Sequence, residues 1–265
     1  SGSAENSAPK DGLTVNFQAA TSKGKLYLKE RIGGHLFKID STTSSDKKTF
    51  HLATAGLPTG YYAISFDDKN EVEFIISGEE KMTFSFPGNA LGYNNANAGN
   101  SVQNVALWKY KIFEKNTQDN IDPIKAEQVK NKRNRPLVNE LKVKIDKLVE
   151  EKRNYAKTLA AELPGTYFAK TAVAAVPAQP QPANVYFNDI DFADASLIRS
   201  PVYPERVMDY VHLHTGYKEP GFRKLVGDVM KRAETNEEVK AFLVRHLLEM
   251  FDEKGPPVML SLIHI

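Results

Sequence analysis

Apolar and polar residues alternate over the first third of the chain, and this period of two predicts short β-strands with one buried face each. The alternating apolar positions are Leu13, Val15 and Phe17; Leu26 and Leu28; Phe37 and Ile39; Phe50 and Leu52; Tyr62, Ile64 and Phe66; Val72, Phe74 and Ile76; and Met82, Phe84 and Phe86. Turn-forming residues such as Gly33 and Gly34 separate them. We therefore predict an antiparallel β-sandwich or barrel-like domain over residues 12–87.

Helical spacing replaces this alternation after residue 100. Residues 88–100 are rich in Asn, Gly and Ala and predict an ordinary surface loop, after which Ser101 can cap a helix. That helix and a longer one after Pro136 carry these apolar positions: Val102, Val105, Ala106, Trp108 and Ile112; then Leu141, Ile145, Leu148, Tyr155, Leu159 and Leu163. Pro164 and Gly165 end the longer helix. With a short helix after this break, the predicted helical region covers residues 101–176.

A second helical block follows a proline-rich linker at residues 177–184. In residues 185–255, Pro204 suits a helix start, and Thr235 with Glu238 matches a capping box. Its apolar positions keep helical spacing: Tyr203, Val207, Tyr210 and Val211; Phe222, Leu225, Val226, Val229 and Met230; and Val239, Phe242, Leu243, Leu247 and Met250. The chain is therefore predicted to be α+β, with the β domain followed by an all-α helical region.

Composition narrows the classes of function. The 265 residues are 41% hydrophobic, enough to fill a core. Thirty-five Lys and Arg against 33 Asp and Glu leave a net charge of +2, so no field of the whole molecule attracts nucleic acid or an anionic membrane. No stretch approaches the ~20 consecutive apolar residues of a transmembrane helix. The count of Cys is 0, which excludes a disulfide, a thiolate nucleophile or a CxxC motif within these residues.

The two ends of the sequence differ from the rest. Residues 1–11 are small and polar and predict a flexible tether. They are either a remnant of an expression sequence or the start of a mature envelope lipoprotein whose lipidated Cys preceded Ser1. Residues 256–265 form an atypical apolar tail that resembles a translated sequencing adapter, so we expect it to lie outside the fold. The alternative is an ordinary terminal strand.

The histidines are weak candidates for a metal site. His212 and His214 are one residue apart, a spacing that on a strand lets two rings share a metal ion. Their surroundings are helical, where side chains two residues apart point to nearly opposite sides. We therefore expect no metal there. His246 falls on the apolar face of the last helix and is expected to pack in the core or at an interface.

Three aspartates, Asp189, Asp191 and Asp194, have a spacing similar to that of a calcium-binding loop. That loop needs Gly at its sixth position and Glu at its twelfth, where this chain has Asp194 and Ser200. We expect Asp194 to cap the following helix instead.

Residues 125–144 are locally basic. Their basic side chains are Lys125, Lys130, Lys132, Arg133, Arg135, Lys142 and Lys144, set against Glu127 and Glu140. No aromatic residue stands among them to stack on bases, so a solvated helical face is expected and no nucleic-acid partner. The chain also lacks the local motifs of nucleophilic, phosphate-binding and zinc hydrolase sites. We therefore predict no catalytic, cofactor-binding or metal-binding residue.

Two parts of the sequence resemble domains of one family. Residues 24–28, 60–66 and 72–78 resemble strands of the small β domain, of unknown function, at the front of certain envelope thioredoxin-like thiol-disulfide oxidoreductases. Residues 186–202, together with residues 235–251, resemble the helical domain that usually sits just before the thioredoxin fold of those proteins. The resemblance extends over about residues 12–254, and residues 256–265 depart from it.

The resemblance implies a noncatalytic accessory region of such an oxidoreductase, because the family's CxxC motif lies in the thioredoxin domain. This region would position the redox domain or bind its protein or peptide client. It implies the cell envelope, either the periplasm or the outer membrane surface, with a membrane link only through a lipid anchor upstream of Ser1. The alternative is a stand-alone envelope binding module for a peptide, glycan or protein. A hydrolase with a nonlocal site is a third interpretation. The oligomeric state and the client stay open.

Overall fold

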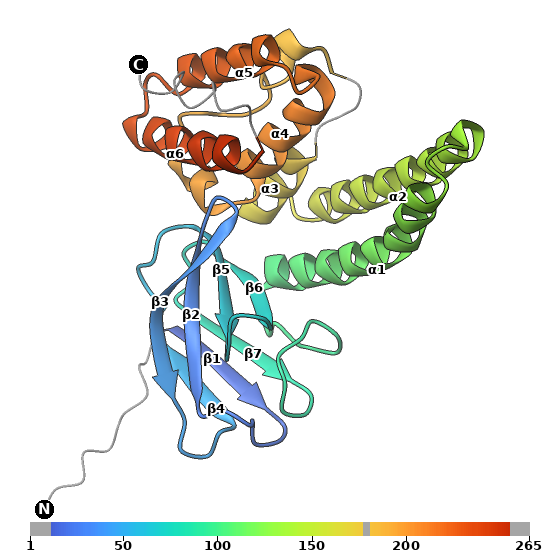
Figure 1. Ribbon diagram of the computed structural model, residues 1–265. Coiled ribbons are helices and arrows are strands. Elements are labelled where there is room, and N and C mark those ends of the chain that lie inside the picture. The colour runs from blue at the N-terminus through green and yellow to red at the C-terminus, as the bar shows by residue number, and fades with distance from the viewer. Residues whose placement is uncertain (1–11, 177–180, 255–265) are drawn as a thin grey trace, which may run out of the picture.

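The computed structural model describes residues 12–176 and 181–254 and confirms the predicted α+β class (Figure 1). Its strands are β1 (Gly12–Phe17), β2 (Lys25–Ile32), β3 (His35–Thr43), β4 (Thr49–Leu52), β5 (Gly60–Ser65), β6 (Glu71–Ile76) and β7 (Lys81–Phe86). Its α-helices are α1 (Val102–Lys130), α2 (Arg135–Ala161), α3 (Tyr167–Ala175), α4 (Val202–Tyr210), α5 (Glu219–Arg232) and α6 (Glu237–Lys254). Its short helical turns are η1 (Ala183–Val185), η2 (Ala195–Arg199) and η3 (Val211–Thr215). The predicted tether (1–11), part of the linker (177–180) and the tail (256–265) lie outside the described residues.

Two sheets pack face to face as a sandwich. One has the strand order β4-β1-β7 and the other the order β3-β2-β5-β6. Aromatic rings fill the space between them, with Phe74 of β6 5.2 Å from Phe84 of β7 and Phe17 of β1 5.5 Å from Phe66 after β5. The predicted antiparallel pairing needs one correction, since β1 runs parallel to β7. Between β1 and β7 the chain forms all four strands of the other sheet, so no hairpin joins β1 to β7 and fixes their relative direction.

The outer strand β3 departs from the predicted burial. Phe37 and Ile39 were expected on a buried face, but they are 52% and 41% exposed. The reason is that β3 is an edge strand, which pairs with β2 alone and contributes little to the core between the sheets.

Strands β5 and β6 are buried on both faces, so the expectation of one buried face per strand is wrong for them. One face of each strand meets the other sheet. Helix α1 covers the opposite face of β6, whereas on β5 the Tyr61 hydroxyl hydrogen bonds to Thr171 of α3 at 2.6 Å. The indole Nε1 of Trp108 donates to the carbonyl of Glu73 at 2.8 Å. The side-chain amide of Asn104 accepts from the backbone N–H of Ile75 (2.6 Å) and donates to its carbonyl (3.0 Å). Asn104 thus satisfies backbone groups that an edge strand leaves unpaired.

Helices α1 and α2 form a long antiparallel hairpin that projects from the side of the sandwich (Figure 1). The Asn134 side chain caps α2 by accepting from the N–H of Leu137. Val102 was expected on the buried face of α1 but is 61% exposed, because Gln103 and Asn104 face the sheet instead. Neither helix of the hairpin, nor any other helix in the described part of the chain, is apolar over a membrane-spanning length.

The later helices enclose a second apolar core. The predicted apolar faces of α4, α5 and α6 all point into it. Asp194 caps η2 as expected, accepting from the N–H of Ser196 at 3.0 Å. The predicted capping box at Thr235 is wrong, because Asn236 caps α6 by accepting from the N–H of Val239 at 3.1 Å. The helix therefore begins one residue later than the pattern indicated.

Arg206 on α4 is fully buried and holds that helix in place. Its guanidinium donates to both carboxylate oxygens of Asp189 at 2.9 and 2.8 Å and to the carbonyl of Ala174 in α3 at 3.0 Å. It also lies over the ring of Tyr186. Charge-assisted hydrogen bonds of this kind fix geometry strongly. The neighbouring residue Glu205 is thereby held in one position relative to α3.

The C-terminal helical part rests on the tip of the β2–β3 hairpin. Gly33 at this tip has φ +59° and donates its N–H to the carbonyl of Ile198 at 2.8 Å. A Cβ at Gly33 would lie 2.9 Å from the ring of Phe242 in α6. Beside this contact, Arg199 forms an ion pair with Glu30 at 2.5 Å. The sandwich and the helical part therefore meet in a close, directional interface.

The substitution Gly33→Ala should destabilise the protein, because it adds a clash with Phe242 to the cost of a left-handed backbone, about 1–2 kcal/mol. A thermal melt should show a loss of at least several degrees, since ~1 kcal/mol shifts a protein of this size by about 2–4 °C. Gly34→Ala is the matched control, because no atom lies within 4 Å of a Cβ at that position. Equal effects of the two substitutions would contradict the packing described.

Candidate functional site

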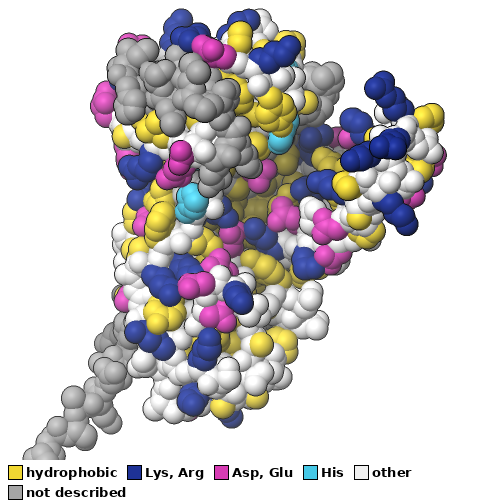
Figure 2. Space-filling model, in the orientation of Figure 1, with side chains coloured by type: hydrophobic (Ala, Val, Ile, Leu, Met, Phe, Trp, Pro, Cys, Tyr) yellow, Lys and Arg dark blue, Asp and Glu magenta, His cyan; other side chains and the backbone are white. Residues whose placement is uncertain are grey.

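A cleft lies where the sandwich, the α1–α2 hairpin and α4 meet. It consists of an outer groove of about 900 Å³ and an inner pocket of about 120 Å³. Figure 2 shows the hollow between the projecting hairpin and the rest of the molecule, with charged side chains of both signs around it. The two cavities share five lining residues, all charged: Glu73, Lys111, Glu114, Lys152 and Glu205. These residues form the mouth through which the inner pocket opens into the groove, and we call them the charged mouth.

Glu73 is the buried centre of this mouth. The alternation of β6 turns Val72, Phe74 and Ile76 toward the other sheet, so Glu73 faces α1. Its carboxylate accepts from Arg31 of β2 and from Lys111 of α1, the latter at 2.8 Å. Burial alone would raise the pKa of Glu73, but the charges of Lys111 and Arg31 outweigh burial and hold that pKa below its ordinary value. The carboxylate is therefore ionised at neutral pH.

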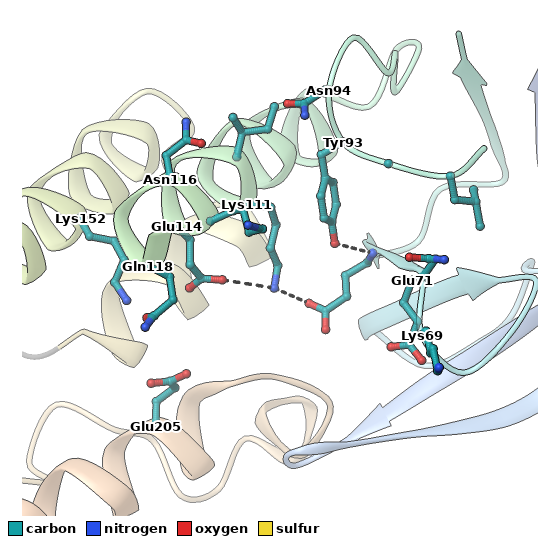
Figure 3. Close-up of a pocket in the computed structure, with 16 residues that line it drawn as sticks. Lys69, Glu71, Tyr93, Asn94, Lys111, Glu114, Asn116, Gln118, Lys152 and Glu205 are labelled. Atoms are coloured by element: carbon teal, nitrogen blue, oxygen red, sulfur yellow. Dashed lines mark hydrogen bonds and ion pairs between the residues drawn. The ribbon is translucent and has the colours of Figure 1, made fainter. Parts of the chain in front are cut away.

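Helix α1 brings two opposite charges to the mouth. Lys111 and Glu114 lie one turn apart on the same helix face, with Nζ and carboxylate oxygen 3.8 Å apart. Lys111 thus links Glu73 to Glu114, as the dashed lines in Figure 3 show. Burial would lower the pKa of Lys111, but the negative Glu73 raises it above its ordinary value. Lys111 therefore stays charged.

The loop 88–100 supplies the wall of the groove. Leu91, Gly92, Tyr93 and Asn94 line it, and the Tyr93 hydroxyl accepts from the backbone N–H of Glu73 at 2.9 Å (Figure 3). Burial raises the pKa of Tyr93 to about 12, so its phenol stays protonated. The sequence predicted an ordinary surface loop here. A single Tyr among Asn and Gly residues was the one available sign that the loop is anchored.

The floor of the inner pocket is largely apolar. Its apolar lining residues are Leu107, Phe168, Ala172, Ala175, Val176 and Pro201. Two phenols and the Arg31 side chain, which pairs with Glu73, complete the lining, and Tyr61 hydrogen bonds to Thr171 at 2.6 Å. Burial raises the pKa of Tyr61 to about 12 and also raises the pKa of Tyr110. Both phenols are therefore neutral, and the floor is suited to an apolar group.

Glu205 and Lys152 complete the mouth from different parts of the fold. Glu205, on α4, lies across the gap from Lys152 of α2 (Figure 3). Neither side chain forms an ion pair with another described residue. Glu205 is open to solvent within the cleft, yet the surrounding protein partly desolvates it. This burial, together with the negative Glu114, raises the pKa of Glu205.

The histidine and aspartate candidates have structural partners. His212 and His214 lie on the π-helical turn η3, where His212 hydrogen bonds to Tyr217 and His214 packs against the ring of Tyr210 at 5.1 Å. Among the described residues, no three His, Asp or Glu side chains gather as metal ligands would. His246 stacks on Phe242 with ring centroids 5.7 Å apart, and burial lowers its pKa.

The aspartate cluster is divided among separate roles. Asp189 pairs with the buried Arg206. Asp194 caps η2 and forms an ion pair with Lys170 at 2.5 Å. Asp191 accepts from the N–H of Ala193 at 2.9 Å. The three carboxylates thus stabilise local structure.

The basic stretch lies at the free end of the hairpin, where Figure 2 shows several Lys and Arg side chains. Lys142 and Lys144 of α2 pair with Asp146 and Glu140 on the same helix. The others are exposed at the tip: Lys125, Lys130, Lys132, Arg133 and Arg135. This arrangement is a solvated surface, remote from the cleft.

No family model, no curated protein and no solved structure matches this chain. The chemistry of the cleft must therefore be judged from its own residues. The described residues that line the two cavities include no His, Ser, Thr or Cys. A few charged groups over a largely apolar floor are typical of small-molecule pockets, catalytic or not.

Replacing Glu73 by Gln should cost about 3 kcal/mol of unfolding free energy at pH 7, because Arg31 and Lys111 would lose their buried partner. The folded pKa of Glu73 lies below 4.5, so its contribution is complete above that pH and is lost as the pH falls through the folded pKa. The difference between wild type and Glu73→Gln should therefore narrow below pH 4.5. Urea unfolding of both proteins at several pH values measures this difference in unfolding free energy.

Glu140→Gln is the control, since Glu140 pairs with Lys144 on the exposed helix surface. We expect a change of no more than about 0.5 kcal/mol. A stability difference for Glu73→Gln that stays constant from pH 7 to pH 3 would contradict the buried ion pair.

Proposed function

We propose that this chain is a noncatalytic accessory region of a cell-envelope thioredoxin-like thiol-disulfide oxidoreductase. In this proposal the outer groove binds a segment of the client polypeptide, and a separate redox domain carries out thiol exchange. The groove between three parts of the fold is the observation that carries the proposal. The resemblance of residues 60–66 and 186–202 to that family supports the oxidoreductase context and the envelope location.

The composition supports a division of labour. Thiol–disulfide exchange needs an attacking thiolate, and the 265 residues contain 0 Cys. Any redox step would therefore take place on another domain or another protein. In this proposal the role of the chain is to bind a partner polypeptide.

The lining of the groove supports a polypeptide partner. Asn70, Asn94, Asn116 and Gln118 offer amide donors and acceptors that match a peptide backbone. Lysine and glutamate side chains line the same groove, so client segments of either charge find a complementary group. A volume of about 900 Å³ is at the upper end of the usual range for binding pockets.

Client binding is tested with the full chain and a fluorescein-labelled, reduced and S-carboxymethylated α-lactalbumin as the unfolded probe. Fluorescence anisotropy should show saturable binding. Asn116→Trp places a large ring on the groove wall and should weaken binding at least about tenfold, or ~1.4 kcal/mol. Asn120→Trp, one turn away on α1 and outside the lining, should leave binding unchanged. Equal affinities of the two variants would contradict the groove as the client site.

The redox context is tested separately. The purified chain should reduce insulin no faster than a blank without protein, because it has no thiol. Reading the coding sequence beyond codon 265 distinguishes the two proposals: a thioredoxin fold with CxxC in frame supports the accessory region. A stop codon, or binding on a glycan array with none to the unfolded probe, favours the stand-alone binding module.

A further inference from the structure

The charged and the apolar lining residues of the inner pocket lie at different depths. All five residues that it shares with the outer groove are charged, whereas the residues that only the inner pocket contacts are mostly apolar. A ligand that fits this order has an apolar end inside and a charged head at the mouth. A basic peptide side chain has the opposite order, with its charge at the far end.

Some charges at the mouth are paired with one another and two are not. Arg31 and Lys111 both contact Glu73, and Lys111 also reaches Glu114, so two cations and two anions form one neutral network. Glu205 and Lys152 remain, one negative and one positive, with no ion pair to another described residue. A ligand head with a single charge would pair with only one of them and leave the other unmatched. A zwitterionic head pairs with both and keeps the mouth neutral.

We propose that the inner pocket binds a free α-amino acid with an apolar side chain. The ammonium group lies toward Glu205, the carboxylate lies toward Lys152, and the side chain occupies the apolar floor. The site uses only the inner pocket and its mouth, so it goes beyond the client groove proposed above. Binding is reversible and involves no chemical step.

The volume of the pocket limits the side chain. A cavity of about 150 Å³ in another protein accepts benzene, and the inner pocket has about 120 Å³. Side chains of about four carbon or sulfur atoms fit this space, as in leucine, isoleucine or methionine. Glycine would leave the floor empty, and the indole of tryptophan exceeds the space.

The test uses isothermal titration calorimetry of the full chain with three ligands that share the leucine side chain and differ in which charged groups they carry. L-Leucine carries both charges, leucinamide carries only the ammonium, and N-acetyl-leucine carries only the carboxylate. Loss of one charged partner should weaken binding about tenfold or more. We expect leucine to bind most tightly. Leucinamide or N-acetyl-leucine binding as tightly as leucine would overturn the proposal and indicate a peptide terminus as the ligand.

Two variants assign each charge of the ligand to its partner. Glu205→Gln should weaken leucine but leave N-acetyl-leucine unchanged, and Lys152→Met should weaken leucine but leave leucinamide unchanged. Both variants should fold, since neither residue belongs to an ion pair in the described structure, and a thermal melt verifies this. Glu140→Gln and Lys144→Met, which alter an exposed pair on α2, are the matched controls.

The amino-acid site and the client groove can be tested independently of each other. Asn116→Trp should block the unfolded probe while leucine still binds, because Asn116 lines the outer groove and not the inner pocket. Absence of leucine binding at millimolar concentration, or equal loss in the control variants, would overturn the amino-acid site and leave the client groove unaffected.

Discussion

The covering of β6 by α1 is the constraint on which the rest of the structure depends. Three successive turns of α1 present Asn104, Trp108 and Lys111 to residues 73–75, as an amide, an indole and an ammonium group. Each of these groups satisfies a polar atom that the strand would otherwise bury without a partner. Because α1 is fixed at this end, the direction of the whole hairpin is set. The position of the cleft beside it follows.

The charged mouth contains both paired and unpaired charges, and the fold determines which are paired. Arg31 and Glu73 come from β2 and β6 of one sheet, and Lys111 comes from the helix packed on that sheet, so the three form ion pairs. Glu205 is held by the clamp of Arg206 on Asp189, and Lys152 is held by the hairpin. These separate supports keep Glu205 and Lys152 apart across the opening. Charged groups that are held in place but have no partner in the protein favour binding of a ligand with complementary charges.

Periodicity alone was enough to find the strands and helices, because a period of two or of 3.6 reflects which face is buried. It did not reveal that β5 and β6 are covered twice, although adjacent apolar residues such as Ile75 and Ile76 carry that signal. The parallel pairing of β1 with β7 leaves no local trace, because it depends on how the chain crosses between sheets. The sequence did not predict the cleft either. Glu73, Lys111 and Glu205 are ordinary charged residues, distant in sequence, and only the packing of three parts brings them together.

The chain contains a single tryptophan, and its place in the fold has a practical consequence. Trp108 is 3% exposed, and its indole donates to the carbonyl of Glu73, directly beneath the mouth of the cleft. Indole emission responds to hydrogen bonding and to nearby charges. Any event that shifts β6 against α1, or changes the field of the neighbouring Lys111, alters the environment of this indole, and no second tryptophan contributes to the signal. The protein therefore carries a built-in optical probe at the base of its cleft.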